Sequence, residues 1–183
     1  MSGADKTAEF SRVVSVESLD GTGRALEFEA CGEELEAVRR RLGLDGLSSL
    51  RAKARLLRTG RDRVRVDIDF RADVLQSCVV TLEPVRSLVS ETGAAWFQQD
   101  ADPADEPDLL DPDAPDPPEP LVEGRIDVGE LIVQHLALAL DPYPRAEGAN
   151  VGDVLPPVGE IEEGADGDAQ DSAFAVLARL KGR

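Results

Sequence analysis

The sequence predicts an α+β protein whose core is a mostly antiparallel β-sheet with two helices packed against it. Three observations predict this class. One long stretch alternates apolar and polar residues around a central turn, two others repeat apolar residues at helical spacing, and 42% of the 183 residues are hydrophobic. That length suits about one domain of roughly 150 residues. We place a single domain at residues 10–145, with an insertion at about 100–123 and a tail at 146–183.

The first expected elements are a hairpin and a helix. Residues 12–19 and 24–30 have the composition of strands, and the Asp-Gly-Thr-Gly at 20–23 is typical of a turn. Glu33–Leu42 then has apolar residues at helical spacing. Glutamates fill its first turn, arginines fill its last, and Gly43 follows as a stop signal.

Residues 47–58 and 61–74 are predicted to form a second hairpin with Thr59-Gly60 at its tip. Both arms alternate, so aliphatic side chains share one face while arginine and lysine side chains share the other. Residues 75–82 and 85–97 are candidates for further strands. Pro84 between them indicates an edge or a bend.

The rest of the chain is strongly acidic, apart from one helix. Residues 100–123 are rich in proline and acids, which predicts disorder. Asp127 and Glu130 have the spacing of a helix cap, and the helix that they begin should end before Pro142. Residues 146–183 form an acidic flexible tail, in which a short helix is expected at 172–181.

Charge is divided unevenly along the chain. Residues 1–99 hold 15 bases and 16 acids, whereas residues 100–183 hold 5 bases and 21 acids. Within the first part, ten bases face only two acids between residues 39 and 65. These ten are the RNA-contact candidates: Arg39, Arg40, Arg41, Arg51, Lys53, Arg55, Arg58, Arg61, Arg63 and Arg65.

Four short strings carry a resemblance to a known family. They are Gln76-Ser-Cys-Val-Val-Thr-Leu-Glu-Pro-Val85, Glu119-Pro120, Arg125-Ile-Asp-Val-Gly-Glu130 and Leu138-Ala-Leu-Asp-Pro-Tyr-Pro-Arg145. In this order they resemble the YceD family of large ribosomal RNA subunit accumulation proteins, over roughly residues 10–145. The 17 arginines against 3 lysines suggest its alphaproteobacterial branch.

The resemblance implies a role in accumulation or processing of large-subunit (23S) ribosomal RNA and in ribosome assembly. It supplies no catalytic residue. The family-motif residues are Cys78, Thr81, Leu82, Glu83, Pro84, Asp127, Glu130, Asp141, Pro142, Tyr143, Pro144 and Arg145. Many members have a Cys-x-x-Cys pair where this chain has Cys78-Val-Val-Thr81, so we expect no metal and no cofactor.

Catalytic interpretations are weaker than structural ones. Cys31, Cys78 and His135 lack the paired spacing of zinc ligands, and triads are recognised by geometry. His135 falls on an apolar helical stripe, which favours a core or boundary position. Asp67 and Asp69 alternate with apolar residues, which is typical of a solvated strand face. We therefore expect a protein that is not an enzyme.

Two functions stay open. In the first, the basic strand face contacts phosphates of ribosomal RNA or of a pre-ribosomal particle. Aromatic residues are absent from the basic stretch, which argues against sequence-specific recognition of single strands and leaves contacts to phosphates or to RNA shape open. In the second, the acidic part binds a basic ribosomal protein as an adaptor or chaperone, without RNA contact. The acidic insertion could also fold back onto the bases. No secretory signal or membrane span is seen, so we expect a cytoplasmic protein.

Overall fold

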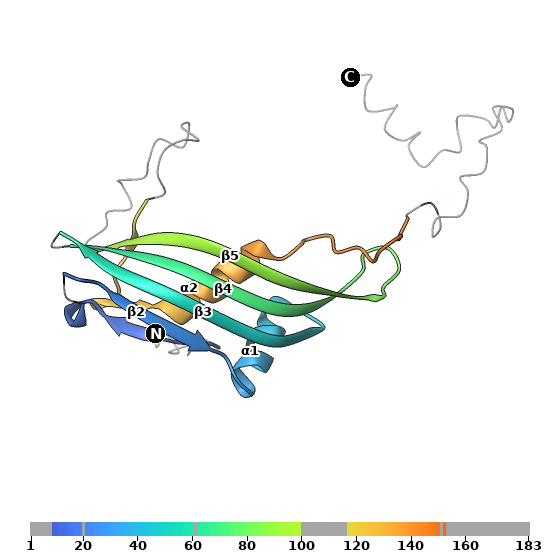
Figure 1. Ribbon diagram of the computed structural model, residues 1–183, viewed down its shortest axis with the longest axis horizontal. Helices are drawn as coiled ribbons and strands as arrows, with labels where there is room; N and C mark the ends of the chain where they lie inside the picture. Colours follow the sequence, from blue (N-terminus) through green and yellow to red (C-terminus); the bar gives the residue numbers. More distant parts are fainter. Residues whose placement is uncertain (1–8, 20, 61, 100–116, 151, 153–183) are drawn as a thin grey trace, which may run out of the picture. The chain divides into compact units, whose positions relative to one another are not determined.

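The computed structural model describes residues 9–19, 21–60, 62–99, 117–150 and 152 (Figure 1). The chain divides into two units, residues 1–147 and residues 148–183, and the fold below belongs to the first. Its elements are β1 (Val13–Ser15), a 3₁₀ turn η1 (Val16–Ser18), β2 (Arg24–Glu29), α1 (Glu33–Leu42), β3 (Gly46–Thr59), β4 (Arg63–Ser77), β5 (Pro84–Gln98), β6 (Glu119–Pro120), β7 (Arg125–Asp127) and α2 (Val128–Ala139). The predicted α+β class is confirmed.

The larger sheet has the strand order β2-β3-β4-β5-β6. All neighbours are antiparallel except β5 and β6, which run parallel over two residue pairs. The predicted hairpin around Thr59-Gly60 is confirmed as β3–β4, with Gly60 in the left-handed region at φ +75°. The prediction of a separate strand over residues 75–82 is wrong, because β4 runs on through Ser77 and a loop then leads to Pro84.

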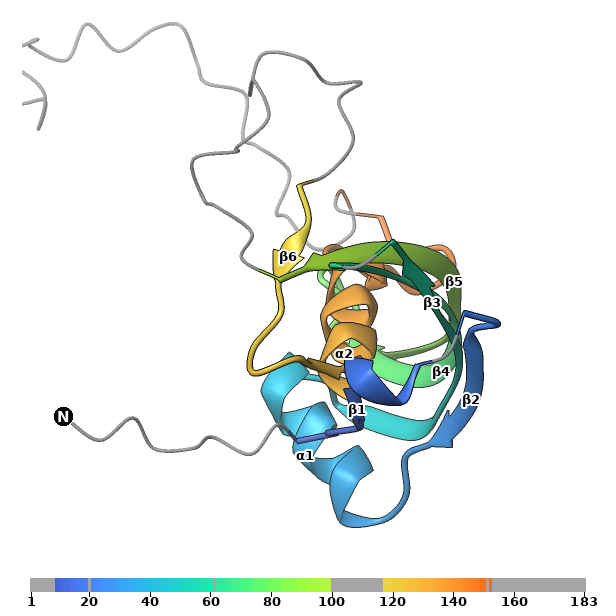
Figure 2. The ribbon, with the colours of Figure 1, turned by 90° about the vertical axis from the view of Figure 1, so that its left-hand side faces the viewer.

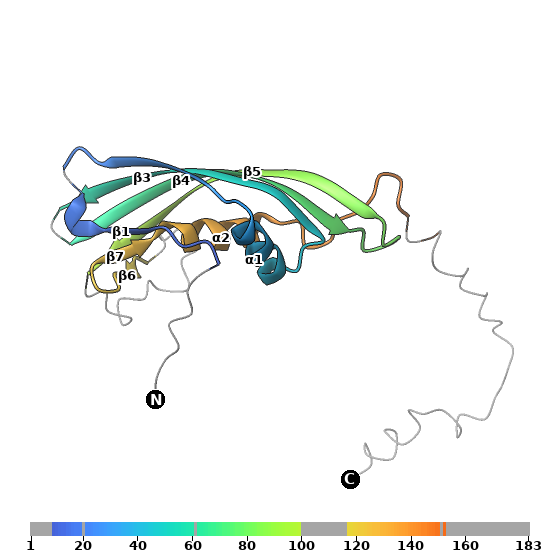
Figure 3. The same ribbon diagram turned by 90° about the horizontal axis from the view of Figure 1, so that it is seen from below.

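The predicted hairpin between residues 12–19 and 24–30 is also wrong. β1 instead pairs with β7, with Val14 opposite Ile126, and β2 pairs with β3. Figure 3 shows β1 and β7 on the helix side of the larger sheet. The cause is a set of tertiary hydrogen bonds from residues 11 and 12 to Asp127, which no local turn signal reveals.

The strands of the larger sheet curve around α2, which contacts β4 and β5 (Figure 2). The inward side chains of β3 and β4 are nearly all buried aliphatic residues. On β4 every second residue is buried from Val64 to Phe70, which is 1% exposed. From α2, Ile132, Val133 and Leu136 are fully buried against them. A burial pattern of this kind is the main source of the stability of the fold.

Both helices follow their predicted signals. α1 has the predicted bounds, and Gly43 ends it in the left-handed conformation at φ +64°. α2 begins after Asp127, whose carboxylate accepts hydrogen bonds from the N–H groups of Gly129 and Glu130, and it ends before Pro142. His135 of α2 is half-buried. Its ring lies over Gly93 of β5, where a Cβ would stand 2.6 Å from Cε1.

The predicted helix at 172–181 lies outside the described residues, and so does most of the segment 100–123 for which disorder is predicted. Residues 117–123 are described and include β6. Whether the acidic insertion covers the bases therefore stays a prediction.

Candidate nucleic-acid interface and the two ends of α2

The side of the larger sheet that faces away from the helices carries the basic strand residues. We call it the outer face, and cross-strand register builds it. Its charged residues are Glu27, Glu29, Arg51, Lys53, Arg55, Arg63, Arg65, Asp67, Asp69, Arg71, Asp73 and Arg86, and its uncharged residues on β5 include Thr92, Ala94 and Trp96. The predicted segregation is confirmed, because Leu50, Ala52 and Ala54 point inward while the bases between them are exposed.

Four of these bases form ion pairs across strands or along one, and one of the pairs joins Arg86 to Asp73. Arg51 contacts Glu29 at 2.9 Å, Lys53 contacts Glu27 at 3.0 Å, and Arg65 contacts Asp67 at 2.7 Å. All six side chains of these three pairs are more than 40% exposed. Such exposed pairs are worth about 0–1 kcal/mol, so phosphate oxygens can replace the carboxylates at little cost.

The remaining strand arginines differ in the contacts that the structure describes for them. Arg55 makes no ion pair or hydrogen bond with any residue that the structure describes, and the same is true of Arg71 on β4. Arg63 donates to the side-chain oxygen of Gln98 at 2.7 Å. Arg58 is exposed on β3, and Arg61 lies outside the described residues. The outer face thus offers two fully available guanidinium groups.

The three arginines of α1 lie elsewhere and are engaged in the structure. Arg39 donates twice to Glu36 and once to the carbonyl of Leu44. Arg40 is 3.8 Å from Glu36. Arg41 binds Glu130 of α2 and Glu9. The structure therefore does not bring these residues together with the strand bases, although the sequence places all ten in one stretch.

A shallow hollow of about 660 Å³ crosses the outer face at its centre. It exists because small side chains, Ala25 on β2 and Ala94 on β5, flank the row that contains Arg55 and Asp67. Lys53 and Arg65 also line it. The hollow therefore combines an apolar floor with charged walls.

Trp96 is the residue of this face that sequence reasoning missed. It stands opposite Arg65 in the register, and the Arg65 guanidinium carbon lies 5.6 Å from the centre of its ring. The signal was the alternation of β5, because Phe97 is buried and its neighbour must point outward. An aromatic residue thus lies beside the bases although none occurs within their stretch of sequence.

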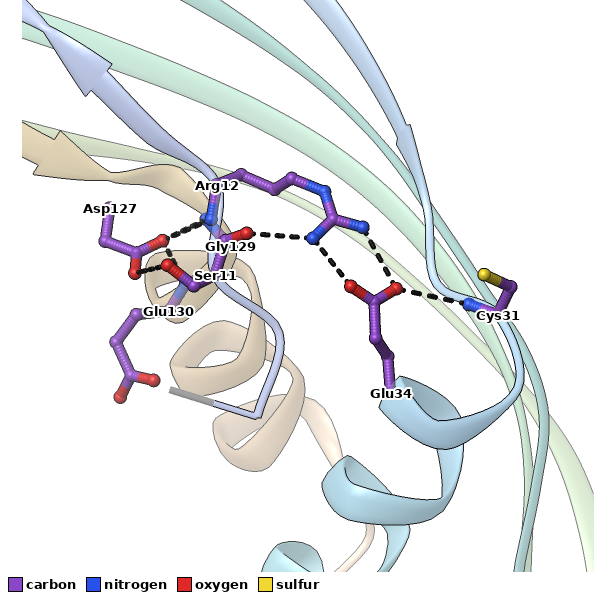
Figure 4. Close-up of polar contacts among 7 residues, drawn as sticks. All are labelled: Ser11, Arg12, Cys31, Glu34, Asp127, Gly129 and Glu130. Carbon is purple, nitrogen blue, oxygen red and sulfur yellow. Dashed lines mark hydrogen bonds and ion pairs between the residues drawn. The ribbon is translucent and has the colours of Figure 1, made fainter. Parts of the chain in front are cut away.

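Three parts of the chain meet at the start of α2: the first residues of α2 with Asp127, residues 10–12, and α1 (Figure 4). We call this contact region the joint. The Asp127 carboxylate caps the helix and also accepts hydrogen bonds from the hydroxyl of Ser11 at 2.6 Å and the N–H of Arg12 at 2.7 Å. Gly129 allows this approach, since a Cβ there would lie 2.2 Å from the carbonyl oxygen of Phe10. The Asp and Gly of this motif therefore have architectural roles.

Two arginines extend the same joint to α1. Arg12 donates to both carboxylate oxygens of Glu34, at 2.7 and 3.0 Å, and stacks on Phe10 at 4.3 Å. Arg41 binds Glu130 through two hydrogen bonds of 2.5 and 2.6 Å. The hydrogen bond from Arg12 lowers the pKa of Glu34, and that from Arg41 lowers the pKa of Glu130. Both carboxylates are therefore held ionised.

The other end of α2 brings two more of the motif strings together, and the fourth, Glu119-Pro120, forms β6. The N–H of Val79 donates to the carbonyl of Pro144 at 2.9 Å, and the side chain of Gln76 donates to the carbonyl of Asp141 at 3.0 Å. The Asp141 carboxylate in turn accepts from the N–H of Tyr143. The loop after β4 and the segment after α2 thus fix each other.

Cys78 lies inside this loop and is fully buried. Its sulfur accepts from the N–H groups of Val80 and Thr81, both at 3.4 Å. Hydrogen bonds from the Thr81 side chain, and next from the backbone of Ala146, lower the pKa of Cys78 to about 6. Cys31 is exposed. Over the described part of the chain, no three Cys, His, Asp or Glu side chains gather in a metal-binding arrangement.

Together these features define a class: an α+β protein whose curved antiparallel sheet packs one face on a helix and displays charged groups on the other. The chain belongs to the YceD family, because the family model described as "Large ribosomal RNA subunit accumulation protein YceD" matches residues 66–181. The match begins within β4 and includes the tail, whereas the sequence strings suggested residues 10–145. The alphaproteobacterial branch stays a prediction.

Searches of curated proteins and of solved structures found no match to this chain. Among the helices that the structure describes, none has the length and apolar character needed to cross a membrane.

Proposed function

We propose that this protein acts in the accumulation of large-subunit ribosomal RNA in the cytoplasm, as a binding protein without a catalytic step. We further propose that the outer face contacts phosphates of ribosomal RNA or of a pre-ribosomal particle. Family membership supports the first statement, since the family's name refers to accumulation of large ribosomal RNA. The arrangement of bases on the outer face supports the second.

The single observation that carries the RNA contact is the excess of available bases on the outer face. Its charged set holds seven bases and five acids among the described residues, in a chain whose net charge is −17. Arg55 and Arg71 have no carboxylate partner among the described residues, and the neighbouring pairs are exposed. Phosphate oxygens would complete the hydrogen bonding of these guanidinium groups, which favour bidentate contacts with phosphate.

Charge reversal at the two unpaired arginines tests this function. The variant with Arg55→Glu and Arg71→Glu breaks no ion pair between residues that the structure describes, so it should fold normally. We expect less pre-ribosomal RNA to co-purify with it, and a lower level of 23S ribosomal RNA in cells that carry only this variant. The loss arises because each contact to phosphate adds a salt-dependent contribution to binding.

The matched control reverses two exposed arginines away from the outer face, Arg40 and Arg125, which are 68% and 63% exposed. Its net charge equals that of the test variant. We expect it to keep RNA association and 23S levels near wild type. Equal losses in both variants would mean that net charge, and not the outer face, governs RNA association. Normal RNA association in the test variant would reject direct contact.

A second function, an adaptor or chaperone for a basic ribosomal protein, is supported by the concentration of acids in residues 100–183. It requires no RNA contact. Deleting residues 102–118 should then abolish function, whereas the RNA-contact function survives the deletion. Treating the purified complex with ribonuclease separates the two, because a directly bound protein partner stays associated after the RNA is removed.

A further inference from the structure

The geometry points to single-stranded RNA as the ligand of the outer face, with one base stacked on Trp96. This inference rests on the proposed RNA contact and names the substrate class and the residue that selects it. It is carried by the placement of Trp96, by the distribution of charge along the outer face, and by the hollow next to it.

Trp96 is held as a platform by the sheet. β5 pairs with β4 along its whole length, and the neighbouring Phe97 is 7% exposed on the inner side, so the indole stays on the outer face. The ring is half-buried, which leaves part of it open to a ligand. Arg65 lies over the same ring and is itself 45% exposed. Aromatic rings next to guanidinium groups are the usual partners of unpaired bases.

Charge is most positive at the end of the outer face where Trp96 lies. Arg65 and Trp96 share one cross-strand row. Arg63 lies in the next row toward the hairpin tip, and Arg55 lies in the next row away from the tip. The outer-face acid nearest this end is Asp67, which Arg65 already binds, while Asp62 lies in the turn and Glu119 of β6 stands opposite Phe97. The remaining acids lie further along, since Glu27 and Glu29 belong to the rows of Lys53 and Arg51. A strand of RNA would therefore find its phosphate contacts around the indole.

The hollow favours an unpaired base over a duplex. Small side chains line it, Ala94 and Thr92 of β5 among them, and Ala94 lies in the row beside that of Trp96. A base that leaves its stack can lie flat on the indole while its sugar and phosphate occupy this space. The bases of an RNA duplex are stacked on each other and cannot offer a face to a side chain.

Trp96 is the only tryptophan in the chain, so its fluorescence reports directly on the proposed contact. The full-length protein is titrated with a short single-stranded oligoadenylate, and separately with a duplex of oligoadenylate and oligouridylate. We expect saturable quenching by the single strand that weakens as salt is raised, and little quenching by the duplex at the same nucleotide concentration.

Variants are compared by the anisotropy of a dye on the single strand, which does not depend on tryptophan. Trp96→Ala should weaken binding by about 5- to 150-fold, which corresponds to the stacking of one base. Trp96→Phe should stay within a few-fold of wild type, because it keeps an aromatic face. Leu88→Ala is the matched control. That side chain is 71% exposed on the same strand and should be replaceable without effect.

The outcomes separate the inference from the function on which it rests. If Trp96→Ala binds as wild type while the Arg55 and Arg71 reversal abolishes binding, RNA contact stands and stacking on Trp96 is rejected. Tighter binding of the duplex also rejects the inference. If wild type binds neither RNA, or binds only a basic protein, both fail. Should Trp96→Ala unfold, the quenching result and the Trp96→Phe affinity decide the matter.

Discussion

Arginine and lysine side chains meet carboxylates in two regions of this protein, with different consequences. At the joint that begins α2, the partners are about one-third exposed or less, as in Arg12–Glu34 at 28% and 30%. On the outer face they are mostly exposed, as in Lys53–Glu27 at 70% and 77%. The joint connects segments far apart in the chain, whereas the outer-face pairs join strands that backbone hydrogen bonds already hold. Charge is therefore structural in the first region and available to a ligand in the second.

The largest expected effect is at Gly129, where the joint leaves no room for a side chain. Gly129→Ala should lower the free energy of unfolding by about 3 kcal/mol or more, because the new Cβ would meet backbone atoms of Phe10 and Arg12. This loss exceeds the gain of about 1 kcal/mol from replacing glycine within a helix. Urea unfolding measures the difference. Gly21→Ala is the control, since nothing lies within 4 Å of its Cβ position, and a stability of Gly129→Ala near wild type would refute the close approach.

The next effect is at Asp127. Asp127→Ala should destabilise the protein by about 2 kcal/mol, because α2 loses its cap and the N–H of Arg12 loses its acceptor. Asp127→Asn keeps one side-chain oxygen and should lose about half as much. Thermal unfolding of the two variants beside wild type measures this order. Equal stability of the alanine and asparagine variants would contradict the role given to the carboxylate oxygens.

A smaller effect compares one ion pair from each region directly. A double-mutant cycle on Arg41 and Glu130 should give a coupling of about 1–2 kcal/mol, since their two hydrogen bonds are partly shielded from water. The same cycle on Lys53 and Glu27 should give less than about 0.5 kcal/mol. Chemical unfolding of all single and double variants provides both values. Equal couplings would remove the distinction between the two regions.

The smallest effect is the pH dependence of the Arg41–Glu130 coupling. Arg41 lowers the pKa of Glu130 below its ordinary value of 4.5 in the folded protein. The stabilisation is therefore complete above that ordinary value, and it is lost as pH falls through the lowered one. The coupling measured at pH 7 should decline at pH 3. A coupling that stays constant or grows on acidification would show that the carboxylate is not the interacting form.

The sequence predicted the elements whose signals are local. The bounds of α1 followed from its charges and Gly43, the cap of α2 followed from Asp127, and alternation predicted the β3–β4 hairpin. These signals act within a few residues, so no tertiary knowledge was needed.

The partners of distant segments could not be predicted in this way. Val14 and Ile126 pair across more than a hundred residues, and Gly129 looks in sequence like a weak point in a helix until Phe10 is found against it. Because the sequence predicted the wrong partner strand for β2, it could not predict the ion pairs of the outer face. Glu27 and Glu29 face Lys53 and Arg51 only because β2 lies beside β3.

The order of the strands has a consequence for synthesis of the chain. β2 to β5 lie side by side in the sheet in the order in which they occur in the chain, with only α1 between β2 and β3, so they can pair as soon as Gln98 has left the ribosome. The helix that covers their aliphatic side is completed about 40 residues later, at Ala139. At about 5–20 residues per second, roughly 2 to 8 s pass in between. During that interval the nascent sheet presents an uncovered apolar surface, and we expect chaperones to bind the growing chain at this stage.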